Sequence, residues 1–190
     1  MYNNMFRTFI RCSHIQNKLK LHQDNINKLS EVVQNNRFLP NLQKNLHNFK
    51  ISDNDYDFIN KHKQTFLNSI KVAFATNIIH KNSRIFSSIS EGFYTIGPCG
   101  EELLAVIGFL LRPKDPTSLH YRHSAIQTAK QYDESNLNDL ILNRARAYVC
   151  SSLDPVTGGV HCSIGGDPNY DFINTSTLAS HSPQAVGRAL

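Results

Sequence analysis

The sequence lacks several patterns that would define its class at once. No apolar run approaches the ~20 residues of a membrane-spanning helix. No Walker loop, G-x-S-x-G elbow or G-x-G-x-x-G fingerprint is present, and the four cysteines form no C-x-x-C pair. These absences argue against a transmembrane segment, a disulfide framework and a zinc ribbon, and they favour a reduced intracellular compartment.

Acidic residues are missing from the first 23 positions, which carry the basic residues Arg7, Arg11, Lys18 and Lys20. The formal net charge is +5, and taking away these four leaves 16 Lys and Arg against 15 Asp and Glu. A phosphate-binding surface needs a strongly basic patch. The charge distribution therefore argues against a nucleic-acid partner.

The N-terminal stretch places Met5, Phe6, Phe9 and Ile10 at helical spacing. A basic, amphipathic segment without acids is typical of a mitochondrial transit peptide. We therefore expect residues 1–23 to direct the protein to the mitochondrial matrix. An ordinary disordered basic tail is the alternative.

Residues 24–82 form an Asn-rich extension without glycine, in which apolar spacing predicts helices over 25–36 and 55–79. We interpret this extension as scaffold or spacer.

The following part, 83–190, begins with a glycine-rich turn. Apolar spacing then predicts a helix from Glu101 to near Arg112. Apolar residues lie on nearly all sides of this helix, as in a central helix that is buried. Acids in its first turn suit the helix dipole, which gives Glu101 and Glu102 a structural explanation.

Two more helices are predicted, from Ser124 onward and over 136–150, followed by more than thirty residues rich in Gly, Ser, Thr and His. A loop of that length is usually functional or disordered, and its paired glycines favour a ligand site. Beyond the loop, Pro183 is placed as the first residue of a last helix capped by Ser182.

Two groups of residues could carry chemistry. Tyr121 and Arg122 precede a predicted helix N-terminus, where they could hold a phosphate, or could simply stack on each other at the surface. A metal cluster would have to draw on scattered histidines and cysteines, and His-x-x-His, their only short spacing, matches no standard zinc arrangement. These residues are His120, His123, His161, His181, Cys150 and Cys162.

Four segments, in order, resemble the alpha part of the decarboxylating component of thiamine-diphosphate-dependent 2-oxo acid dehydrogenases, closest to the branched-chain and fused alpha-beta types. They read GFYTIGPCGEE (92–102), RPKDPTSLHYRHSA (112–125), DPVTGGVHCSIGG (154–166) and NTSTLASHSPQAVGRA (174–189). The resemblance covers about half of the chain. It implies an α/β thiamine-diphosphate-binding fold, of which the portion present is truncated, mostly helical and bears a long Gly/Ser/Thr loop.

The resemblance implies an oxidoreductase that decarboxylates a 2-oxo acid such as 3-methyl-2-oxobutanoate, in branched-chain amino acid catabolism, and passes the acyl group to a lipoyl partner. Tyr121 and Arg122 match the residues that reach the cofactor diphosphate. Ser176 and Leu178 match positions that contact the aminopyrimidine. His161 matches a histidine that faces the substrate carboxylate in fused members, and a buried structural histidine is the alternative.

The resemblance also places a potassium-binding turn at Thr175, Thr177, Ser180 and His181. His181 stands where those members carry Gln, and a ring nitrogen suits a hard cation poorly, so potassium is not expected. The family's magnesium ligands, a Gly-Asp-Gly motif and an Asn, have no counterpart in this chain. We therefore expect an incomplete enzyme, inactive alone, that needs a beta-type part and a lipoyl acyltransferase core in a hetero-oligomer. A non-catalytic helical interaction module and a small metal-binding helical protein are the alternatives.

Overall fold

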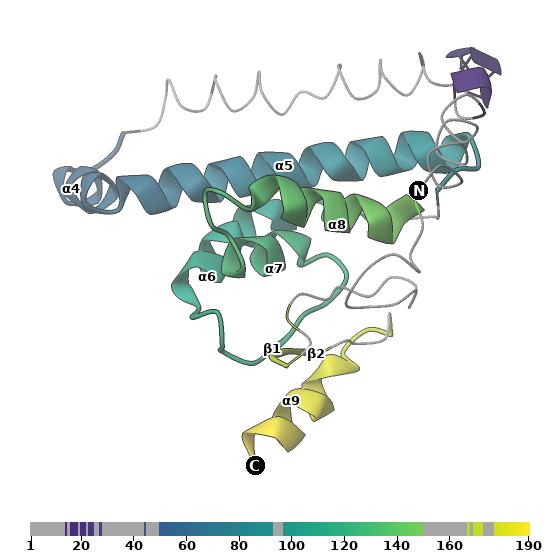
Figure 1. The fold of residues 1–190 in the computed structure, drawn as a ribbon. Coiled ribbons are helices and arrows are strands. Elements are labelled where there is room, and N and C mark those ends of the chain that lie inside the picture. Colours follow the sequence, from purple (N-terminus) through teal and green to yellow (C-terminus); the bar gives the residue numbers. More distant parts are fainter. Residues whose placement is uncertain are drawn as a thin grey trace.

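The computed structural model describes residues 50–92, 97–149, 169–172 and 177–190, together with Asp167 and scattered positions between 14 and 44. Within these residues most of the chain is helical (Figure 1). The elements are α4 (Asp53–Lys61), α5 (Lys63–Ser88), the 3-10 helix η1 (Glu101–Leu104), α6 (Ala105–Leu110), β1 (Thr117–Ser118), α7 (Ser124–Lys130), α8 (Leu137–Val149), β2 (Asp171–Phe172) and α9 (His181–Ala189).

The hydrophobic core lies where α5, α6, α7 and α8 meet. Val72 of α5 is fully buried against small residues, Ala105 of α6 and Ala125 and Ala129 of α7. Small side chains let the helices approach closely. Around this centre pack four partly buried side chains, Ala73, Phe109, Tyr132 and Leu137.

The segment predicted as one helix over 55–79 is helical, but a break at His62 (φ −110°, ψ 21°) divides it into α4 and α5. No proline or glycine marks this break in the sequence. The helix also continues nine residues beyond the predicted end. It stops because Ser90 adopts a left-handed conformation (φ 57°) and Glu91 N–H donates to the Phe86 carbonyl at 2.9 Å, which is a Schellman motif with serine in the usual glycine position.

The helix predicted from Glu101 to Arg112 is shorter than expected, and its predicted burial on nearly all sides is wrong. Its first turn is η1 and its last residue is Leu110. Ala105 and Gly108 are buried, whereas the larger apolar residues on the opposite side, Leu103, Ile107 and Leu110, are exposed. Close packing on α7 selects small residues, so the bulky ones lie outside.

The other two helix predictions agree with the structure. The helix expected from Ser124 is α7, and the helix expected over 136–150 is α8. The helix expected from Pro183 begins two residues earlier, at His181, and Ser180 precedes it without a side-chain cap. Pro183 lies in the first turn, where its missing N–H has no helical partner to lose.

The described strands are short. β1 and β2 pair in parallel, with Thr117 opposite Asp171 and Ser118 opposite Phe172. This bridge joins the loop before α7 to the segment before α9, and Figure 1 places α9 at the end of the molecule opposite α5. The helix predicted over 25–36 and the N-terminal 23 residues lie largely outside the described residues. Among the helices described, none is long and apolar enough to span a bilayer.

Candidate functional site

The turn before α7 gathers the side chains that the sequence analysis singled out. His123 N–H donates to the His120 carbonyl at 2.8 Å, and His123 Nδ1 accepts from His120 N–H at 3.0 Å. The Tyr121 ring lies on the His120 ring, with centroids 3.5 Å apart, and the Arg122 guanidinium lies 5.4 Å from the Tyr121 centroid. Four consecutive residues therefore form one compact unit at the start of a buried helix.

The turn before η1 contacts this unit. Arg122 Nη1 donates to the Gly97 carbonyl and approaches Cys99 Sγ at 3.1 Å. Glu101 Oε2 lies 3.0 Å from His123 Nε2. At Gly97 a Cβ atom would come within 2.6 Å of His80 Cε1, so only glycine lets the turn approach α5 this closely.

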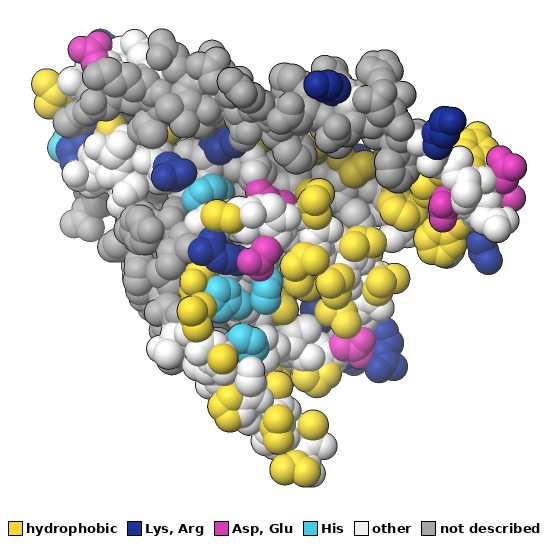
Figure 2. All heavy atoms as spheres, turned by 180° about the vertical axis from the view of Figure 1, so that it is seen from behind, with side chains coloured by type: hydrophobic (Ala, Val, Ile, Leu, Met, Phe, Trp, Pro, Cys, Tyr) yellow, Lys and Arg dark blue, Asp and Glu magenta, His cyan; other side chains and the backbone are white. Residues whose placement is uncertain are grey.

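The C-terminal segment reaches the same place. The His181 ring, at the first residue of α9, lies with its centroid 6.2 Å from that of His120. We call His120, His123 and His181, with Arg122 and Glu101, the histidine cluster. Figure 2 shows histidine side chains gathered on one face of the molecule beside basic and acidic ones.

Burial controls the electrostatics of the histidine cluster. Burial lowers the pKa of His120, and the neighbouring His123 lowers it further. Burial also lowers the pKa of His123, and Glu101 only partly opposes this effect. Both rings are therefore neutral near pH 7, which leaves Arg122 as the cluster's permanent positive charge.

Two observations bear on whether an anion fits here. Among the described residues, the buried His120 Nε2 has no hydrogen-bond partner. The contacts that Arg122 makes with described residues use Nη1, although a guanidinium carries five N–H donors. A phosphate group could satisfy both residues, so this donor set fits the diphosphate of a cofactor.

Glu102, which the helix dipole seemed to explain, has a more specific role. It is buried, and its carboxylate accepts from Gly100 N–H at 2.6 Å and from the Asn77 side chain of α5. Glu102 therefore ties the η1 turn to α5. It holds the turn that contacts Arg122 in place.

The remaining predicted site residues are only partly described. Thr177, Leu178 and Ser180 form a turn in which Ser180 N–H donates to the Thr177 carbonyl at 3.2 Å, and Leu178 is 73% exposed. His181 follows and joins the histidine cluster. Three further predicted site residues lie outside the described residues: His161, Thr175 and Ser176.

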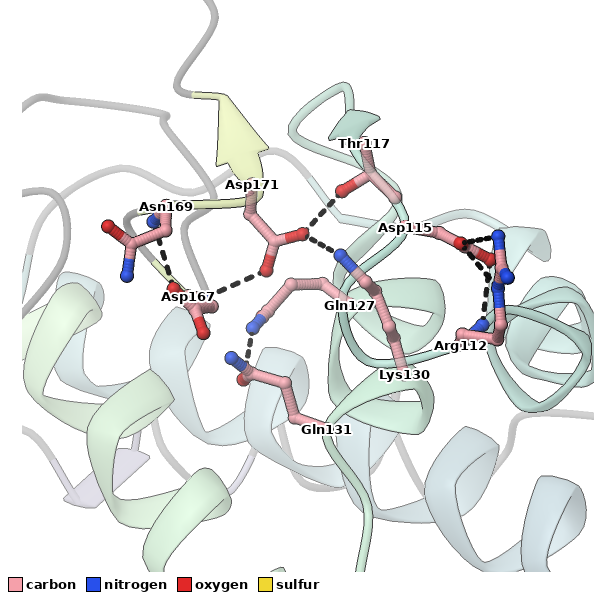
Figure 3. Close-up of polar contacts among 9 residues, drawn as sticks. All are labelled: Arg112, Asp115, Thr117, Gln127, Lys130, Gln131, Asp167, Asn169 and Asp171. Carbon is pink, nitrogen blue, oxygen red and sulfur yellow. Dashed lines mark hydrogen bonds and ion pairs between the residues drawn. The ribbon is translucent and has the colours of Figure 1, made fainter.

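A buried ion pair that no sequence pattern marks anchors the C-terminal segment. Lys130 Nζ donates to Asp171 Oδ1, and both side chains are almost fully buried. Asp171 also accepts from Thr117 Oγ1 at 2.6 Å and from Asp167 N–H at 2.8 Å (Figure 3). We call Thr117, Lys130, Asp167 and Asp171 the ion-pair cluster. No sequence signal could have found it, because its residues are up to 54 positions apart and follow no motif.

The alternative of a metal-binding helical protein gains no support from the described part of the chain. Within it, no group of three or more His, Cys, Asp or Glu side chains could hold a metal ion. Both ring nitrogens of His123 have other contacts, since Nδ1 accepts from His120 N–H and Nε2 lies 3.0 Å from Glu101 Oε2.

Comparison of the chain with protein-family models, with curated proteins and with solved structures finds no match.

Proposed function

We propose that this chain is the N-terminal part of the alpha portion of a thiamine-diphosphate-dependent 2-oxo acid dehydrogenase of branched-chain type, with the α/β fold of that family in its complete form. The observation that carries this proposal is convergence. Three segments that resemble the family are separated in sequence, yet their side chains meet in the histidine cluster through Arg122, Glu101 and His181.

Arg122 and Tyr121 would hold the diphosphate. The guanidinium fork suits two phosphate oxygens, and the Gly97 carbonyl orients it by accepting from Nη1. His120 Nε2 has no hydrogen-bond partner among the described residues, so a phosphate oxygen that reached it would give it one, with the ring protonated at Nε2. When bound, the cofactor supplies the electron sink for decarboxylation. The protein residues orient it and exclude water.

Leu178 and the neighbouring Ser176 would contact the aminopyrimidine ring. The 73% exposure of Leu178 agrees with a side chain whose apolar partner is a ligand or another polypeptide. Because the chain carries no counterpart of the magnesium ligands, turnover would require a longer alpha polypeptide together with a beta-type partner, with delivery of the acyl group to a lipoyl carrier. The basic N-terminal segment supports import into the mitochondrial matrix.

The direct test is calorimetric titration of the full chain with thiamine diphosphate and with inorganic pyrophosphate. We expect both to bind, and Arg122→Ala to weaken binding by about tenfold or more, because a charge-assisted contact is lost. Arg112→Ala is the matched control, since this exposed arginine pairs with Asp115 outside the cluster. Equal affinities for the chain and its Arg122→Ala variant would contradict the assignment.

An activity assay separates a fragment from a complete enzyme. With 3-methyl-2-oxobutanoate, thiamine diphosphate and magnesium, we expect no turnover by the 190-residue chain alone. Turnover would refute the proposed incompleteness. Co-purification with beta-type subunits and a lipoyl acyltransferase from mitochondria, but not from cytosol, is the expected result in cells.

A further inference from the structure

His80 of α5 packs against the turn that contacts Arg122. A Cβ atom at Gly97 would meet three atoms of the His80 ring first, with Cε1 at 2.6 Å, Cδ2 at 2.8 Å and Nε2 closer still. Gly97 is buried, and its φ lies outside the left-handed region, so its backbone conformation also suits residues with a side chain. The His80 ring is therefore the main obstacle to a side chain at position 97.

Two residues one helical turn apart on α5 support this turn. Asn77 donates to the Glu102 carboxylate at one end of it, and the His80 ring packs on Gly97 at the other. Residues three positions apart share one face of a helix, so α5 presents a single surface to the turn. The Gly97 carbonyl accepts from Arg122 Nη1. Whatever fixes Gly97 therefore also fixes the guanidinium.

The His80 ring contributes shape rather than charge. Its Nδ1 is buried and has no hydrogen-bond partner among the described residues. Burial lowers the pKa of His80, and the neighbouring Arg84 lowers it further, with Glu102 opposing them. The ring is therefore neutral near pH 7, and it can lie near Arg122 without repelling it.

We propose that His80 is a positioning residue, whose ring sets the place of the Gly97 carbonyl and thereby the orientation in which Arg122 binds a diphosphate group. His80 itself touches no ligand. The carbonyl engages Nη1, which leaves the other N–H donors of the guanidinium for an anion. The effect on the ligand rests on the proposed function, whereas the effect on the Gly97 carbonyl does not.

Calorimetric titration of the full chain with inorganic pyrophosphate tests the effect on the ligand. His80→Ala should weaken binding about fivefold, and Gly97→Ala about tenfold or more, because both variants move the carbonyl that holds Arg122. Two matched controls should leave the affinity almost unchanged. Asn82→Ala changes an exposed neighbour on α5, and Gly187→Ala adds a Cβ that meets nothing within 4 Å.

The double variant His80→Ala/Gly97→Ala separates positioning from general damage. Removing the ring makes room for the added methyl group. The double variant should therefore bind pyrophosphate more tightly than Gly97→Ala alone, although it carries one more substitution. Losses that simply add would overturn the proposal. Circular dichroism reports whether each variant folds.

A measurement without ligand keeps this inference apart from the proposed function. Gly97–Pro98 is the only Gly-Pro pair in the sequence, so ¹³C in glycine carbonyls and ¹⁵N in proline together mark the Gly97 carbonyl alone. Its carbon signal should move in Arg122→Ala, which removes the hydrogen-bond donor. It should move in the same direction, by at least half as much, in His80→Ala, and it should stay in place in Asn82→Ala.

A Gly97 carbonyl signal that stays in place in His80→Ala would overturn the positioning role, whatever the affinities. Both shifts in a chain that binds no pyrophosphate would contradict the proposed function and support the positioning of the carbonyl by His80.

Discussion

α7 and α9 are short helices of seven and nine residues that both begin at the histidine cluster, α7 directly after His123 and α9 at His181, yet the protein holds them in opposite ways. Every residue of α7 is buried, and the helix contacts α5, α6 and η1. No residue of α9 is buried. Its placement depends on the His181 and Arg188 ring contacts and on the β bridge that precedes it.

Polar contacts therefore position the C-terminal part of the candidate site, whereas apolar packing positions the rest. The two modes join at Lys130, the last residue of α7, whose ammonium group reaches Asp171 of β2, the strand that precedes α9. A site assembled in this way can be disturbed on one side without disturbing the other.

The largest effect is expected from breaking the buried ion pair. Lys130→Met keeps most of the side-chain volume but leaves the Asp171 carboxylate buried without its cation, which costs about 3–5 kcal/mol. We expect urea unfolding to show this loss, and hydrogen exchange to show that amides of α9 lose more protection than those of α8. The double variant Lys130→Met/Asp171→Asn should recover part of the stability, because a neutral amide still accepts from Thr117. A double variant as unstable as the single one would contradict this role for charge.

A smaller loss is expected at the contact between α6 and α7. A Cβ atom at Gly108 would come within 2.6 Å of Ala129 Cβ and closer still to the Ile126 carbonyl oxygen. Gly108→Ala should therefore cost about 1–3 kcal/mol by forcing the two helices apart, despite its better helix propensity. The urea midpoint measures this effect. If it is unchanged, the two helices are less tightly packed than the structure indicates.

The apolar helices were predictable from sequence because their periodicity is local. Ser124 and Leu137 begin helices almost where their apolar spacing predicted. Sequence failed where a boundary depends on backbone conformation without its usual residue, as at His62 and at Ser90 in the left-handed region. It also failed for α6, because amphipathic spacing reports which residues are apolar but not whether a neighbour covers them.

The candidate site was predictable only in part. Resemblance selected Tyr121, Arg122 and His181, and these residues do lie together. The contact of Arg122 with the Gly97 carbonyl and the Lys130–Asp171 pair depend on tertiary structure, so no spacing along the chain reveals them.

We expect the stability of the folded protein to fall at low pH, because three of its histidines are shielded from water in the folded state. Burial lowers the pKa of His80, His120 and His123 in the folded protein, so the unfolded chain binds protons more readily as the pH falls through about 6.5. Stability is therefore expected to be full above that pH and to fall below it. Thermal unfolding between pH 7.5 and 5.5 should show a declining Tm, less steeply in His120→Asn. Equal slopes in the two proteins would argue against burial as the cause.

The smallest effect is expected from the same change, glycine to alanine, at Gly187 of α9. There the substitution should stabilise the helix, whereas at Gly108 it should destabilise the protein. A Cβ atom at Gly187 would meet nothing within 4 Å, and the residue is exposed in a helix without positive φ. Gly187→Ala should therefore favour the helical state of α9 by up to ~1 kcal/mol. The global urea midpoint should barely move, since α9 buries nothing whose exposure limits unfolding. Hydrogen exchange should reveal slower exchange confined to α9. A midpoint shift as large as that of Gly108→Ala would mean that α9 belongs to the cooperative core after all.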